Sequence, residues 1–191
     1  APRQRYSRNE NKKIKNGVIP EGWEKPENKS KLAQKDIDAD WTKKNGERHF
    51  EYKDHVKCDA DSKLITNYSV TSASVHDSQR CLVFIGQEDE VLYADSAYSG
   101  KPIALALPEN CKNQICEKGY RNSPLTSEQK MNNRRKSRIR CRIEQIFGFM
   151  TGAMHGITIR SIGITRAWMN IGITNLVYNF CRYSYLKRTS A

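Results

Sequence analysis

The chain has 191 residues, of which 37% are hydrophobic, enough for one domain, or one domain plus a tail, with a modest core. It carries 33 Lys and Arg against 21 Asp and Glu, a formal net charge of +12 that points to a polyanionic partner, nucleic acid before membrane. No stretch approaches the roughly 18 apolar residues of a membrane-spanning helix, and the polar, basic first segment shows no signal-peptide pattern.

Residues 1–46 show no periodic hydrophobicity. They hold basic clusters, and Pro20 and Pro26 interrupt any helix there. We expect a basic extended arm or loop. Either it contacts a DNA backbone, or it is only a solvated charged segment.

A β-hairpin is expected next. Residues 50–56 alternate in polarity, residues 64–70 are β-prone, and the polar residues 59–62 between them favour a turn. A short helix is expected over residues 77–85, although this stretch is ambiguous.

Residues 91–95 form an apolar, β-prone run that predicts a buried strand ending at Asp95. A helix over residues 101–107 tolerates Pro102 in its first turn and ends at Pro108. Residues 114–116 are a candidate short strand.

The clearest helix begins at Thr126, where Gln129 completes a capping-box pattern. An apolar stripe continues along it, comprising Ile139, Ile143, Ile146, Phe147 and Met150. Lys136, Arg140 and Glu144 are four residues apart and are expected on a neighbouring face. A last helix is predicted over residues 164–186, with Trp168, Ile171, Asn175, Tyr178 and Cys181 or Arg182 spaced for packing.

This order of elements predicts an α/β fold with a mixed sheet and flanking helices. We expect three segments: the arm (1–46), a catalytic core (47–163) and a C-terminal helix packed on it (164–191). The six cysteines form no CxxC pair, and the Cys111–Cys116 spacing is weak for zinc, so reduced thiols of a cytoplasmic protein are expected.

Two carboxylates carry the strongest chemical signal. Asp95 lies at a strand end, where sites of open α/β sheets gather, and Glu144 follows 49 positions later in an arginine-rich segment. Carboxylates from different elements can hold two divalent ions about 4 Å apart for phosphodiester chemistry, usually with a third carboxylate. The alternatives are a capping role for Asp95 and a surface ion pair for Glu144.

Seven Lys or Arg lie between positions 130 and 142, with no acidic residue among them. We expect them to contact DNA phosphates, and the binding to weaken with salt. The alternative is a plain nucleic-acid patch without chemistry. The predicted DNA-binding residues are Arg134, Arg135, Lys136, Arg138, Arg140 and Arg142.

Several blocks together resemble the DDE transposases of bacterial insertion sequences, the IS-five group. The resemblance runs in order from Ala1 to about Lys187. The blocks are Asp38–Lys44, Phe50–Asp59, Ala73–Ser78, Tyr93–Gly100 and Arg142–Gly148.

The resemblance implies a ribonuclease H-like fold and cut-and-paste transposition with Mg²⁺, for which Mn²⁺ can substitute. It implies that Asp95 is the second catalytic Asp and metal ligand, and Glu144 the catalytic Glu and metal ligand. It further implies double-stranded DNA as partner, both element ends and target, in a homo-multimer at the bacterial nucleoid.

In members of this family the first catalytic Asp lies in a strand a few residues before an Ala-Pro like the one that opens this chain. We therefore expect the first strand and first Asp upstream of Ala1, and a fragment inactive alone. Ser137 and Thr151 stand where the family has Tyr and Lys, and Glu51 replaces a Gly, which suggests decay of the element.

Two other functions stay open. One is a basic nucleic-acid-binding remnant without catalysis. The other is a stand-alone ribonuclease H-type nuclease, which needs its own first acid, and none of the early candidates ends a convincing apolar strand. Those candidates are Asp36, Asp38, Asp40 and Asp59.

Overall fold

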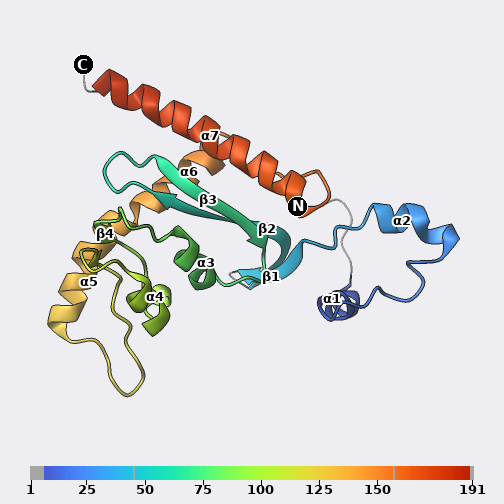
Figure 1. Cartoon of the computed structure of the whole chain (residues 1–191), viewed down its shortest axis with the longest axis horizontal. Helices are drawn as coiled ribbons and strands as arrows, with labels where there is room; N and C mark the ends of the chain where they lie inside the picture. Colours follow the sequence, from blue (N-terminus) through green and yellow to red (C-terminus); the bar gives the residue numbers. More distant parts are fainter. Residues whose placement is uncertain (1–6, 45, 157, 190–191) are drawn as a thin grey trace. The chain divides into compact units, whose positions relative to one another are not determined.

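The computed structural model describes residues 7–44, 46–156 and 158–189 (Figure 1). The chain forms two compact units. The first unit comprises Ala1–His55, Tyr68–Val75 and Ile157–Leu176. The second comprises Val56–Asn67, His76–Gly156 and Val177–Ala191.

The described residues contain both helices and strands, which confirms a mixed α/β composition. The elements are α1 (Arg8–Lys15), η1 (Pro26–Asn28), α2 (Lys29–Ala33), β1 (Asp40–Lys44), β2 (Glu47–Cys58), β3 (Ile65–Ser72), α3 (Asp77–Phe84), β4 (Val91–Leu92), η2 (Ser96–Tyr98), α4 (Lys101–Ala106), β5 (Lys112–Asn113), α5 (Ser127–Arg140), α6 (Arg142–Gly152) and α7 (Ile164–Thr189).

The strands of the described residues form two sheets and not the single mixed sheet expected. One sheet has the order β1-β2-β3, and β1 pairs antiparallel with β2. The other is the parallel pair β4-β5. The ribonuclease H-like assignment therefore stays a hypothesis.

The N-terminal segment is not extended throughout. Ser7 and Glu10 form a capping box that starts α1: the Ser7 Oγ accepts from the Glu10 N–H, and the Glu10 carboxylate accepts from the Ser7 N–H at 2.6 Å. Strand β1 also lies within the segment expected to be an arm. Local capping and strand pairing thus order residues that carry no hydrophobic periodicity. Residues 1–6 and 45 of the expected arm lie outside the described residues.

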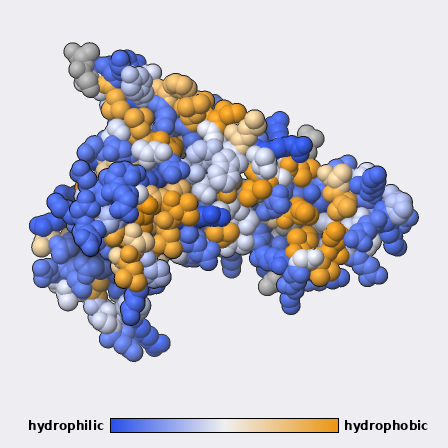
Figure 2. All heavy atoms as spheres, viewed as in Figure 1, coloured by the Kyte–Doolittle hydropathy of each residue, from blue (hydrophilic) through white to orange (hydrophobic). Residues whose placement is uncertain are grey.

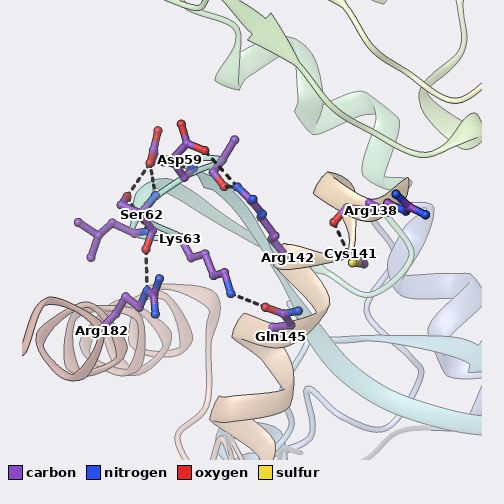
Figure 3. Close-up of polar contacts among 11 residues, drawn as sticks. Asp59, Ser62, Lys63, Arg138, Cys141, Arg142, Gln145 and Arg182 are labelled. Atoms are coloured by element: carbon purple, nitrogen blue, oxygen red, sulfur yellow. Dashed lines mark hydrogen bonds and ion pairs between the residues drawn. The ribbon is translucent and has the colours of Figure 1, made fainter. Parts of the chain in front are cut away.

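The predicted hairpin is confirmed, because β2 and β3 are neighbours joined by a short turn. Asp59 stabilises that turn by accepting from the N–H and the hydroxyl of Ser62, both at 2.6 Å. Figure 3 shows this turn beside side chains of α6 and α7 within the second unit.

The core of the first unit lies between this sheet and the first half of α7. Its buried members are Ala39, Phe50, Tyr52, Val70, Ile159, Ala167 and Ile171. The Asp36 carboxylate is fully buried here and accepts from the Tyr52 hydroxyl at 2.7 Å and from the backbone N–H of Ala39 and Gly163. It ties the start of α7 to the loop before β1.

The second unit has a smaller core of Cys81, Ile103 and Ile115. Strand β4 is shorter than the expected 91–95, but backbone pairing continues past its end. The Cys116 N–H donates to the Ala94 carbonyl at 3.0 Å. The chain therefore reaches Asp95 in an extended, paired conformation. Helices α3 and α4 confirm the predicted helices over 77–85 and 101–107.

The helix predicted from Thr126 starts as expected, with Thr126 and Gln129 forming the capping box. It divides at Cys141 into α5 and α6. Ile146 and Met150, the two buried members of the apolar stripe, lie in α6, whereas Ile139 lies in α5.

Helix α7 confirms the predicted C-terminal helix. Ile171, Asn175 and Tyr178 are buried as expected, whereas Trp168 is 41% exposed and so lies outside the core. Arg182 donates to the Ser62 carbonyl at 2.6 Å. All six cysteines are free thiols. None of the described helices is long and apolar enough to cross a membrane.

Candidate functional site

Asp95 lies directly after the β4-β5 pair and begins the short helix η2. One oxygen of its carboxylate accepts from the Ala97 N–H at 2.6 Å. The capping role considered as an alternative is therefore real, and it uses one of the two carboxylate oxygens. The cap fixes the direction of this half-buried acid at the end of the strand.

Two residues not predicted from the sequence lie near Asp95. Burial raises the pKa of the Tyr98 hydroxyl, and the nearby carboxylates of Asp77 and Asp95 raise it further. Asp77 is the first residue of α3. Both Asp77 and Tyr98 fall within the sequence blocks quoted above, and that was the only signal that could have indicated them.

Glu144 lies in the first turn of α6, and its side chain is 60% exposed. Its carboxylate forms an ion pair with the Arg140 guanidinium at 2.7 Å. The surface-pair alternative is thus also observed. Such exposed pairs contribute little to stability, roughly 0–1 kcal/mol, so Glu144 is available for another cation.

Within residues 7–44, 46–156 and 158–189, no group of three or more His, Cys, Asp or Glu lies close enough to hold a metal ion. Neither Asp95 nor Glu144 therefore belongs to such a group there. The early candidates have structural contacts: Asp36 is buried, Asp40 pairs with Lys15 at 2.9 Å, and Asp59 stabilises the hairpin turn. The described residues alone do not fit a complete metal centre.

The predicted DNA-binding residues divide into two groups. Three have cationic groups already engaged within the second unit. Lys136 donates to the Ile115 carbonyl at 2.9 Å, and Arg140 pairs with Glu144. Arg142 donates to the Ala60 carbonyl and pairs with Asp61 at 3.2 Å (Figure 3).

Lys136 belongs to a set of contacts that attaches α5 to the chain following β5. The Asn133 side chain donates to the Glu117 carbonyl at 3.0 Å and accepts from the Glu117 N–H at 2.9 Å. Lys136 is also 3.8 Å from the Glu117 carboxylate, and its side chain is only 16% exposed. We call Asn133 and Lys136 the α5 attachment. No residue of α5 is buried, so these polar bonds take the place of apolar packing.

The other predicted cations, Arg134, Arg135 and Arg138, are exposed, and so is Lys130. An open hollow of about 600 Å³ follows this side of α5. Its lining residues are Leu125, Lys130, Asn133, Arg134, Ser137, Arg138 and Cys141. Figure 2 shows mostly hydrophilic residues in the region of α5 and hydrophobic ones along α7. Lys130 belongs to the basic run of residues 130–142, although it is not among the six residues predicted to bind DNA.

Residues 22–180 match the family described as the transposase DDE domain. A similar protein is the transposase for insertion sequence element IS1106 from Neisseria meningitidis serogroup B. It is 33% identical over 117 residues, which cover 60% of this chain and 40% of that protein. No solved structure matches the chain.

The family match spans most of the chain and includes Asp95, Glu144 and all of α5. Asp95 and Glu144 lie in two of the sequence blocks that carry the resemblance, Tyr93–Gly100 and Arg142–Gly148. The chain belongs to the DDE transposase domain family.

Proposed function

We propose that this chain takes part in DNA transposition, with Asp95 and Glu144 as catalytic carboxylates and double-stranded DNA as the partner. The observation that carries the proposal is the placement of Asp95 at the end of a paired strand, in the same compact unit as Glu144 and the basic helix α5. The relative from Neisseria meningitidis is named a transposase, which supports the same reaction class.

The two carboxylates have complementary local settings. Asp95 is half-buried and directed by its bond to the Ala97 N–H, whereas Glu144 is exposed and paired with Arg140. Carboxylate oxygens are the ligands that Mg²⁺ and Mn²⁺ prefer. A bound divalent ion would neutralise phosphate charge during cleavage and strand transfer. We propose that at least one further ligand comes from residues other than those described.

Arg140 has a second role in this proposal. Its guanidinium holds the Glu144 carboxylate at 2.7 Å, and a planar guanidinium also binds phosphate well. When DNA enters, Arg140 would exchange its carboxylate partner for a phosphate and leave Glu144 to a metal ion. Multimer formation on paired DNA ends belongs to the same proposal.

The test is Mg²⁺- or Mn²⁺-dependent cleavage of duplex DNA by this chain and by a version extended upstream. We predict metal-dependent cleavage, and its loss in both the Asp95→Asn and the Glu144→Gln variants with DNA binding retained. Glu128→Gln, an exposed acid on α5, is the matched control and should cleave normally. Unchanged cleavage by both active-site variants would refute the assignment.

A binding-only function is the second candidate. It is favoured by the lack of a three-acid cluster among the described residues together with the exposed cations of α5. Salt-sensitive DNA binding by both versions, with cleavage by neither, would support this function.

A further inference from the structure

We propose that one face of α5, formed by Lys130, Arg134 and Arg138, is a contact surface for the sugar-phosphate backbone of duplex DNA, independent of base sequence. We call these three residues the α5 stripe. The inference rests on the proposed function, because it specifies where that function's DNA partner binds. It also separates the cations of α5 that bind DNA from those that hold the protein together.

The three residues of the α5 stripe lie in one row along the helix. Its members are four residues apart, so each lies about 6 Å further along the helix axis and on nearly the same face. Arg135 is beside this face. All four side chains are exposed. No ion pair to any of them occurs within the described ranges.

The hollow beside the stripe has the chemistry of a phosphate site. Its polar lining includes Lys130, Arg134, Arg138 and Ser137, whose side chains can donate hydrogen bonds to phosphate oxygens. Asn133 also lines it, with its amide bonded to the backbone of Glu117. No acidic residue is among the lining residues. No aromatic residue is among them either, so the surface offers no platform for base stacking. These features favour a duplex backbone over unpaired bases.

The α5 attachment fixes which cations of α5 face outward. Asn133 binds both backbone groups of Glu117, and Lys136 binds the Ile115 carbonyl. The helix cannot rotate about its axis without breaking these bonds. Lys136 is therefore a structural cation, although it sits next to Arg135 in the sequence.

The test is fluorescence anisotropy of a labelled duplex with this chain at several KCl concentrations from about 50 to 200 mM. Lys130→Gln, Arg134→Gln and Arg138→Gln should each reduce the slope of log K against log salt by about 0.9, and the triple variant by about 2.7. The loss should be the same for two duplexes of unrelated sequence. Because all three side chains are exposed, the variants should keep the circular dichroism spectrum of the parent chain.

Two controls sharpen the test. Lys101→Gln removes an exposed cation from α4 in the same unit and should leave the slope unchanged. Arg134→Lys keeps the charge and should keep the slope.

The outcomes distinguish this inference from the proposed function. An unchanged slope in the triple variant, with salt-sensitive binding by the parent chain, would refute the α5 stripe as the DNA contact surface. It would not refute DNA as the partner. Absence of DNA binding by the parent chain would refute the DNA partner itself. Tighter binding of an RNA duplex than of DNA, lost in the triple variant, would overturn the assignment of DNA as the occupant.

Discussion

Helices α5 and α7 each hold a neighbouring segment through one asparagine, but they are positioned by different forces. The Asn133 side chain of α5 bonds to the N–H and carbonyl of Glu117 at 2.9 and 3.0 Å. The Asn179 side chain of α7 bonds to the same two groups of Ile65, both at 2.8 Å. Apart from this shared asparagine contact, the two helices differ in how much of their surface is buried.

Helix α7 buries Ala167, Ile171 and Tyr178, whereas α5 has no buried residue. Burial of apolar area stabilises α7, and a few directional polar bonds hold α5 in place. A helix held in the second way keeps most of its surface in solvent. The comparison explains how a helix can be fixed in position and still present three cations to a polyanion.

The largest expected effect concerns the packing of α7. Ile171→Ala removes a side chain that is only 3% exposed and should lower the unfolding free energy by roughly 2–5 kcal/mol, because it leaves a cavity. Met169→Ala, on the same helix but 67% exposed, should change it by less than about 0.5 kcal/mol. Urea denaturation of both variants measures the difference. Equal losses of unfolding free energy in the two variants would contradict the view that only one face of α7 packs against the core.

A pH effect follows from a second contact of α7. Asn175 donates to one oxygen of the Asp54 carboxyl at 3.3 Å. The other Asp54 oxygen and the Asn175 oxygen are buried and have no hydrogen-bond partner among the described residues. A proton on Asp54 would remove the buried negative charge and give its carboxyl a hydrogen-bond donor. Burial raises the pKa of Asp54 from 3.8 to about 6, and the Asn175 hydrogen bond lowers it only in part.

The direction of the pH effect on stability follows from the linkage between proton binding and folding. The folded chain binds this proton more tightly than the unfolded chain, so the contribution to stability is fully present below about pH 4 and is lost as pH rises through about 6. Asp54→Asn should therefore raise the unfolding free energy at pH 8, by up to about 3 kcal/mol, and flatten its pH dependence between pH 4 and 7. Denaturation midpoints across this range test it. If the unfolding free energy changed with pH in the same way in both proteins, Asp54 would not be the source of this pH dependence.

The smallest of these effects concerns α5. Asn133→Ala leaves both backbone groups of Glu117 without their side-chain partner and should cost about 1–2 kcal/mol. Asn132→Ala, one position away, is the control and should cost little. Hydrogen exchange at the Glu117 amide should accelerate only in Asn133→Ala. Retained protection there would show that α5 is held by something else.

The sequence was sufficient where a local rule decides the structure. The Thr126–Gln129 capping box predicts the start of α5, and the apolar period predicts the burial of Ile146 and Met150. The alternation of residues 50–56 predicts the hairpin. A comparable capping box at Ser7 was present in the sequence and could have predicted α1.

Tertiary contacts decide the remaining features. Nothing in the sequence distinguishes Lys136, which is bonded to Ile115, from its exposed neighbour Arg135, because a polar helix has no hydrophobic stripe to orient it. The division of the strands into two sheets is likewise set by long-range pairing. The placement of Asp77 near Tyr98 and Asp95 depends on the packing of α3 and η2.

The central claim is that some cations of α5 contact DNA while Lys136 is bonded within the protein. The most direct test is lysine acetylation followed by mass spectrometry, with and without duplex DNA. Lys130 should react readily in the free chain and become protected by DNA, and the protection should disappear at high salt. Lys136 should react slowly in both states, and Lys101 should react equally in both. Protection of Lys136 or Lys101 by DNA, with Lys130 unchanged, would contradict the account.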